Sequence, residues 1–306
     1  MSIKTVAIAG GSGSLGGPII KDLVSSGFEV TALIRLESAS KPTSFPSAVK
    51  QVTVDYESHD SLVSALQGID AVVSLLNGRG LDFQPAILDA CIEAGVSRFL
   101  PSEFGANTDV PRTAGIPIFQ GKVAFQESLK EKVAQHPGLS YSLIFHGPLF
   151  DFCLAGGLFC DNQNKHMVLY DGGNNRFSTT CLSDLGTVVV GVLTHPEETK
   201  NRVICVEGAN LTQRELLAII EKVTGTKWTT EDAKIIDLEK AMQAELAREE
   251  PNPAVFIPGF LKVYIYGGPA YGPNLRESAP TIDNDIVGLR AYTQEKLEEK
   301  IKAILG

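Results

Sequence analysis

Uninterrupted apolar runs alternate with stretches of helical periodicity through the first half of this chain. A run such as 71–73 (Ala-Val-Val) has no polar alternation, which is typical of strands covered on both faces of a parallel sheet. The predicted strands lie at 5–9, 29–34, 50–54, 71–75, 98–100 and 140–146. The predicted helices between them lie near 15–26, 60–67, 81–94 and 118–134. Right-handed crossovers would join these elements into an α/β fold with a Rossmann-type, doubly wound parallel sheet.

Beyond Gly147 the pattern loosens, and glycine clusters punctuate shorter elements. A helix near 182–193 and a strand at 202–207 are predicted to return to the first sheet. The helices predicted to build a second unit lie near 212–224, 237–249 and 293–305.

This organisation predicts two domains. Residues 1–150 form the Rossmann domain, with later returns near 182–207. Residues 151–306 form mainly a smaller α+β lobe, which we expect to bind substrate.

Charge and composition exclude some partners. The 306 residues carry a formal net charge of −9, from 27 basic and 36 acidic side chains, and the basic ones form no run. Nucleic acid is therefore not an expected partner, because phosphate backbones need clustered Lys and Arg. No stretch reaches the roughly 18 apolar residues of a membrane span, and no secretory signal pattern opens the chain. We expect a soluble, cytoplasmic protein with no membrane partner.

The metal-binding and redox residue types form no motif. The five cysteines are odd in number and contain no C-x-x-C pair, and the five histidines contain no H-x-x-x-H pattern. We expect free thiols in a reducing compartment and no metal site.

Gly10, Gly13 and Gly16 form a G-x-x-G-x-x-G pattern directly after the first predicted strand. Glycine permits a sharp turn and a close approach of backbone N–H groups to a pyrophosphate, and the next helix points its partly positive N-terminus at the phosphates. Such a pattern also occurs in ordinary turns. Here the strand before it, the helix after it and the second strand at 29–34 favour dinucleotide binding. The predicted contacts are Gly10, Ser12, Gly13, Ser14, Leu15 and Gly16.

The end of the second strand predicts which dinucleotide binds. NAD-binding folds usually place Asp or Glu there, whereas this chain has Arg35. A guanidinium matches the 2′-phosphate of NADP(H), and Lys41 is a candidate second cation. Glu37 is a complication, because it offers an acceptor for ribose hydroxyls. Asp55, after the third strand, either approaches the adenine side or caps the following helix.

The segment Arg98-Phe-Leu-Pro-Ser-Glu-Phe-Gly105 closely resembles the R-F-x-P-S-E-F-G segment of one reductase family. That family comprises the isoflavone reductase-like, pinoresinol-lariciresinol and phenylcoumaran benzylic ether reductases, which are atypical short-chain dehydrogenases alongside NmrA-like proteins. The resemblance covers about residues 1–150. We assign Ser102, Glu103 and Phe104 to the cofactor site. The first two equally suit substrate contact or the structural roles of helix cap and backbone anchor.

The resemblance implies a catalytic lysine on the helix after this segment, and Lys122 matches that position. By itself a helix lysine is more often exposed and without a role. The Tyr-x-x-x-Lys string of typical short-chain dehydrogenases is absent here, since Phe119 stands near the tyrosine position. Tyr292 and Lys296 fit the string on the last helix, which we interpret as coincidence.

These residues predict an NADPH-dependent reductase in secondary metabolism. Hydride transfer to a carbonyl, enone or quinone-methide carbon places negative charge on an oxygen, which the Lys122 ammonium would stabilise and protonate. The expected substrate is a small aromatic or polyketide-like molecule. Candidate substrate contacts are His146, Phe150 and Phe152, although a histidine or phenylalanine after a strand is more often structural.

Two alternatives stay open. NmrA-like members include dinucleotide-binding redox sensors that regulate a partner without catalysis. A redox-neutral isomerase or cyclase on the same fold is the second alternative. The sequence leaves the assembly state open, with a homodimer as one candidate.

Overall fold

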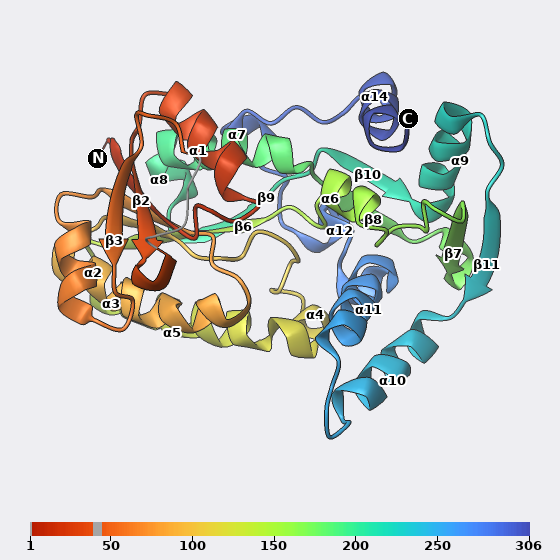
Figure 1. The fold of residues 1–306 in the computed structure, drawn as a ribbon, viewed down its shortest axis with the longest axis horizontal. Coiled ribbons are helices and arrows are strands. Elements are labelled where there is room, and N and C mark those ends of the chain that lie inside the picture. Colours follow the sequence, from red (N-terminus) through yellow and green to blue (C-terminus); the bar gives the residue numbers. More distant parts are fainter. Residues whose placement is uncertain (1, 39–44) are drawn as a thin grey trace.

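A computed structural model describes residues 2–38 and 45–306. Its centre is a seven-stranded sheet in the order β3-β2-β1-β4-β5-β6-β9, in which every neighbouring pair is parallel (Figure 1). The strands are β1 (Thr5–Ala9), β2 (Glu29–Arg35), β3 (Lys50–Val54), β4 (Ala71–Ser74), β5 (Arg98–Leu100), β6 (Ser140–Phe145) and β9 (Arg202–Cys205). The predicted doubly wound α/β fold is confirmed, including the late return of the strand near 202.

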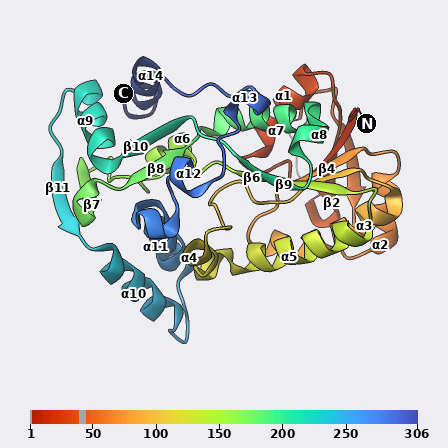
Figure 2. The ribbon, with the colours of Figure 1, turned by 180° about the vertical axis from the view of Figure 1, so that it is seen from behind.

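Helices cover both faces of this sheet (Figure 2). On one face α1 packs against α7, and on the other α2 packs against α3, with α5 beside them. Their bounds are α1 (Gly16–Ser25), α2 (His59–Leu66), α3 (Gln84–Ala94), α5 (Gln120–Gln135) and α7 (Leu185–Thr194). The central strands are buried on both faces, and all four residues of β4 are buried. This burial explains the apolar runs without alternation.

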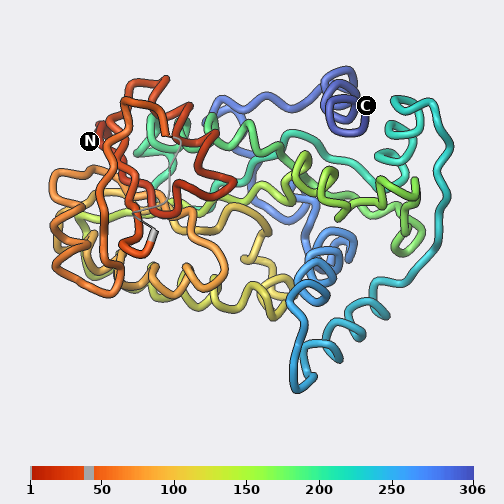
Figure 3. Tube along the Cα trace, in the orientation of Figure 1, coloured from red at the N-terminus to blue at the C-terminus, as the bar shows by residue number. Residues whose placement is uncertain are grey.

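A second group of elements lies beyond the carboxyl ends of the strands. Two small sheets join β10 to β8 in antiparallel and β11 to β7 in parallel pairing. The C-terminal helix α14 packs beside α9, and α10 packs against α11 (Figure 3). The bounds are β7 (His166–Tyr170), β8 (Arg176–Thr179), β10 (Ala209–Thr212), β11 (Thr229–Ala233), α6 (Phe150–Ala155), α9 (Gln213–Thr224), α10 (Ile235–Leu246), α11 (Pro253–Tyr266) and α14 (Gln294–Leu305).

Short helices complete the chain. They are η1 (Leu36–Ser38), η2 (Gly78–Phe83), α4 (Pro111–Ala114), η3 (Pro117–Phe119), η4 (Asp171–Gly173), η5 (Leu182–Asp184), α8 (Pro196–Thr199), η6 (Pro269–Tyr271), α12 (Leu275–Ser278) and α13 (Asn284–Val287). Within the described ranges, no helix is long and apolar enough to span a membrane.

Helix α11 is absent from the sequence prediction. Pro258 lies inside it, and proline removes a backbone donor and disfavours a helix interior. The helix forms because it buries Phe260, Val263 and the tyrosines 264 and 266 in an apolar cluster. Tertiary packing therefore outweighs the local propensity.

The backbone is crowded in the turn between β1 and α1. A Cβ at Gly16 would lie 1.8 Å from the Gly11 carbonyl oxygen, whereas one at Gly17 would meet nothing within 4 Å. Gly16→Ala should therefore lower the free energy of unfolding by roughly 1–3 kcal/mol, as strained or overpacked backbone does. Gly17→Ala should leave it unchanged or raise it by up to about 1 kcal/mol. Urea unfolding of both variants measures the difference, and equal stabilities would contradict the crowding at Gly16.

Candidate active site

The glycine turn has the shape of a phosphate cradle. Gly10 has φ +80°, and a Cβ there would lie 2.9 Å from the Leu75 backbone. The Gly13 amide donates to the Gly10 carbonyl and the Gly16 amide to the Gly13 carbonyl, both at 3.0 Å. No side chain caps the N-terminus of α1, and its first turn has no acidic residue. The predicted contacts Ser12, Gly13 and Ser14 are exposed and Leu15 is half-buried, so this turn fits a pyrophosphate.

Arg35 is exposed at the end of β2, beside Val54 of β3. Within residues 2–38 and 45–306, its guanidinium makes no hydrogen bond or ion pair, so the group is available to bind an anion. Its charge lies near enough to Tyr56 to lower the pKa of that phenol, although burial dominates and raises this pKa to about 12. Glu37 is exposed in η1, and Lys41 lies outside the described residues.

Asp55 follows β3 and shapes the turn into α2. Its Oδ1 accepts the Glu57 amide at 2.9 Å, and its own amide donates to Ser61 Oγ at 3.1 Å. Ser58, rather than Asp55, caps α2 by accepting the Ser61 amide. Of its two predicted roles, the cap is therefore wrong, and contact with the adenine side stays a prediction.

Ser102 ties the ends of β4 and β5 together. Its hydroxyl donates to the Leu76 carbonyl at 2.5 Å, and its amide donates to the Gln84 side chain at 2.8 Å. Both groups are buried. Because the backbone at Leu75 and Leu76 also touches Gly10, this link places the glycine turn next to the segment that follows β5. Ser102 acts as a backbone anchor.

Glu103 and Phe104 form a tight turn after that anchor. The Glu103 amide donates to the Pro101 carbonyl at 2.7 Å, and Phe104 has φ +25°, a left-handed value that costs energy in a non-glycine residue. The Glu103 side chain is buried, and burial raises its pKa to about 7 despite the opposing charge of Lys122. Neither carboxylate oxygen makes a hydrogen bond of good geometry within the described ranges.

Lys122 lies in the first turn of α5 and reaches this turn. Its Nζ donates to the Glu103 carbonyl oxygen at 2.7 Å. Burial lowers the pKa of Lys122, and the Glu103 carboxylate opposes that change. A carbonyl acceptor occupies one of the three N–H bonds of an ammonium, so two donors remain for other partners.

His146 directly follows β6 in the same region. Its amide and the Gly147 amide both donate to the Gly105 carbonyl, at 3.1 and 3.0 Å, which holds this corner against the Glu103 turn. The side chain is fully buried, and neither ring nitrogen has a partner among the described residues. Burial lowers the pKa of His146 to about 4, and the Lys122 charge adds to this effect, so the ring is neutral at physiological pH.

These residues surround a cavity of about 230 Å³, which we call the reaction pocket. Of the predicted site residues, it brings together Glu103, Phe104, Lys122, His146 and Phe152. Phe152 is 59% exposed. The rest of the lining is mostly apolar and includes Phe119, Leu149, Cys153, Leu158, Leu261, Tyr264 and Ile265.

The structure does not bring Phe150 to this pocket. It is fully buried in the cluster behind α6, with its ring centroid 5.9 Å from that of Phe159. Tyr264 is a pocket residue that the sequence reasoning missed. It comes from α11, and its ring meets Phe119 edge-on at 6.0 Å. No local signal identifies it, because it is remote in sequence from the other lining residues.

Comparison with known proteins relates the chain to one family. The sequence model of the NmrA-like family matches residues 2–250. The oxidoreductase aprR of Aspergillus flavus is 29% identical, over 100% of this chain and 99% of that protein. The bifunctional pinoresinol-lariciresinol reductase 2 of Thuja plicata is 26% identical, over 88% of this chain and 90% of that protein.

A solved structure has the same fold. The structure of AtPrR2 with NADP+ and (+)pinoresinol matches with a TM-score of 0.76 and 22% identity, over 99% of both chains.

The buried histidine makes stability depend on pH. Its pKa of about 4 lies below its ordinary 6.5, so between these values the unfolded chain binds a proton that the folded chain does not. Stability contributed by the neutral ring is therefore lost as the pH falls through this window, by about 3 kcal/mol in total. His146→Leu should remove this loss.

The free energy of unfolding above and below the window measures the effect. His136→Gln, at the exposed C-terminal end of α5, is the matched control and should keep the wild-type pH dependence. A wild-type pH dependence in His146→Leu would contradict the assignment.

Proposed function

The chain belongs to the NmrA-like family and is an NADP(H)-dependent oxidoreductase, and from this premise we propose that it reduces a small oxygenated substrate with Lys122 as proton donor. The sequence-based expectations of the family, the oxidoreductase class and the cofactor are confirmed. The proposal concerns the substrate and the roles of individual residues. The observation that carries it is the Lys122 ammonium, anchored on the Glu103 carbonyl at the wall of an apolar pocket.

The glycine turn and Arg35 would hold the cofactor. The uncapped amides at the start of α1 suit the pyrophosphate, and the free guanidinium at the end of β2 suits a 2′-phosphate. When bound, NADPH supplies a hydride at the carboxyl ends of the strands, where doubly wound sheets bind their ligands.

Lys122 stabilises the negative charge that develops on the substrate oxygen and then transfers a proton to it. An ammonium in a pocket that excludes water is worth more than one in bulk solvent, because the local dielectric is low. The carbonyl anchor keeps the donor in place before the reaction, so little reorganisation is needed. No tyrosine is required, which agrees with Phe119 near the usual tyrosine position.

Glu103 favours the charged form of this lysine. Burial favours the neutral amine and lowers the pKa of Lys122, and the nearby carboxylate offsets part of that effect. The Glu103 side chain therefore acts on the reaction through Lys122 and is a positioning residue.

His146 and Phe152 would contact the substrate. A neutral imidazole provides one donor and one acceptor, and both are unpaired in this pocket. An unpaired buried polar group costs about 1–3 kcal/mol, and pairing with a substrate oxygen removes that cost. The apolar walls and the exposed ring of Phe152 suit an aromatic or polyketide-like body.

Replacing the proposed donor separates catalysis from binding. Lys122→Met should lower kcat for NADPH oxidation by about a hundredfold or more, while the Kd for NADPH stays unchanged. The assay uses a panel of aromatic ketones, enones and quinone methides. Lys132→Met is the control on the same helix, because Lys132 pairs with Asp89 away from the pocket. Undiminished turnover in Lys122→Met would end the assignment. Equal binding of NADP+ and NADPH, with no turnover of any substrate, would favour a redox sensor.

Arg35 should set the preference for the phosphorylated cofactor. Arg35→Ala should raise the Kd for NADPH by roughly 10–100-fold, the value of a charge-assisted hydrogen bond, and leave the Kd for NADH unchanged. Lys50→Ala removes an exposed charge from the amino end of the neighbouring strand β3 and should change neither value. Titration of each cofactor by fluorescence measures these constants, and parallel losses for both cofactors would contradict the role of Arg35.

A further inference from the structure

The reaction pocket shares a wall with a second cavity, which we call the outer hollow. It has a volume of about 490 Å³ and is lined by residues 155–163, by the β7 residues His166, Val168 and Tyr170, and by Lys262 of α11. Leu158 lines both cavities. On α11, Leu261 faces the reaction pocket and the next residue, Lys262, lines the outer hollow.

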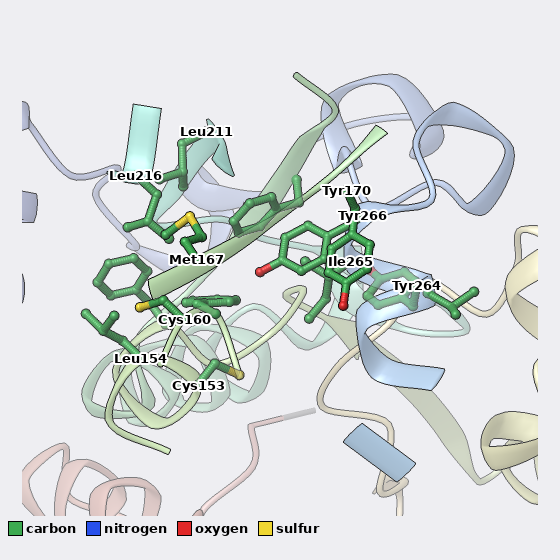
Figure 4. Close-up of a cluster of buried hydrophobic side chains, with 14 of the residues drawn as sticks. Cys153, Leu154, Cys160, Met167, Tyr170, Leu211, Leu216, Tyr264, Ile265 and Tyr266 are labelled. Carbon is green, nitrogen blue, oxygen red and sulfur yellow. The ribbon is translucent and has the colours of Figure 1, made fainter. Parts of the chain in front are cut away.

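One apolar cluster underlies both cavities. Figure 4 shows Cys153 and Tyr264, which line the reaction pocket, in the same cluster as Cys160 and Tyr170, which line the outer hollow. The ring of Tyr170 stacks on Tyr266 with centroids 5.4 Å apart and planes 14° apart. The wall between the two cavities is thus well packed where this cluster forms it. Leu158, which lines both cavities, is only partly buried.

The size of the reaction pocket limits what it holds. A cavity of about 150 Å³ accommodates a benzene ring, so the roughly 230 Å³ of the reaction pocket suits one ring system and little more. Leu158 lines both cavities, so it is the point at which a longer substrate would reach from the reaction pocket to the outer hollow.

Most polar groups of the outer hollow already have partners. The Asp161 carboxylate accepts the Gln163 and Asn164 amides at 3.0 and 2.9 Å, and the Asn164 side chain at 2.8 Å. The Asn162 side chain donates to the Leu154 carbonyl at 2.6 Å. His166 contacts Thr229 at 3.0 Å and Glu231 at 3.8 Å.

Lys262 has no such partner. It is half-buried, and within residues 2–38 and 45–306 its ammonium makes no hydrogen bond or ion pair. Burial lowers the pKa of Lys262, and no carboxylate contributes to reverse that change. A partly desolvated cation without a counter-ion gains from pairing with an anion, and such charge-assisted contacts are stronger than neutral ones.

We propose that the outer hollow is an anion subsite in which Lys262 binds a carboxylate at the far end of the substrate. The substrate class is then an aromatic or polyketide-like acid, whose ring and reacting oxygen lie by Lys122 and whose acidic tail passes Leu158. This inference rests on the proposed function for the placement of the ring. A single lysine provides one positive charge, which matches a monoanion such as a carboxylate.

Two probes, a carboxylate and the corresponding uncharged alcohol, test the subsite by binding alone, without turnover. The Kd values of 4-hydroxycinnamate and of 4-hydroxycinnamyl alcohol are measured by calorimetry with NADP+ present. The wild type should bind the acid about tenfold more tightly, as expected for roughly 1.4 kcal/mol of extra interaction. Lys262→Met should abolish this preference and Lys262→Arg should keep it.

Lys240→Met is the matched control, because Lys240 is exposed on α10 and lines neither cavity. It should keep the wild-type preference, and so should Lys122→Met. Equal binding of both probes to the wild type would overturn the proposal. A preference that survives Lys262→Met but disappears in Lys122→Met would place the carboxylate in the reaction pocket and overturn it too. Because binding is measured without catalysis, an inactive enzyme that retains the Lys262-dependent preference would refute only the proposed donor.

Discussion

The hydrogen bond from Lys122 to the Glu103 carbonyl is the constraint on which the site depends. It joins the first turn of α5 to the strained turn after β5 and holds an ammonium beside a buried carboxylate. Removing a cation from water costs energy unless a partner compensates, and here a carbonyl dipole and a negative charge together do so. The strain at Phe104 persists because buried structure around it leaves the backbone no alternative.

The fold brings cofactor and substrate regions together through a short chain of contacts. Gly10 packs on the Leu75–Leu76 backbone, Leu76 accepts the Ser102 hydroxyl, and Glu103 follows directly. The glycine turn follows β1, whereas the lysine follows β5, so only the pairing of β1 with β4 and of β4 with β5 makes them neighbours. Ligand sites of doubly wound sheets form at such carboxyl edges because the connecting segments converge there.

Two buried polar side chains of the reaction pocket, those of Glu103 and His146, make no hydrogen bond of good geometry within the described ranges. Such groups destabilise a fold, and the surrounding apolar packing compensates. The aromatic cluster behind the pocket, which includes Tyr170, Phe177 and Tyr266, provides a large part of this packing. The apolar walls therefore compensate for the unpaired groups, while the hydrogen bond between Lys122 and the Glu103 carbonyl positions the donor.

The sequence alone determined the features that depend only on residues close together in the chain. An apolar run, three glycines and a helix predict the β1–α1 turn, and Arg35 follows from its place at the end of a strand. The Arg98–Gly105 segment and Lys122 are recognisable as a pattern, although Arg98 itself is buried and donates hydrogen bonds to Ser140, Ser142 and Pro196.

Tertiary structure alone decided which side chains meet. Phe150 faces the core while Phe152 reaches the pocket. Helix α11 contributes Tyr264 and Lys262 from more than a hundred residues beyond Lys122. Local propensity is a short-range property, whereas burial depends on the packing of elements remote in the chain, and for α11 this packing outweighs an interior proline.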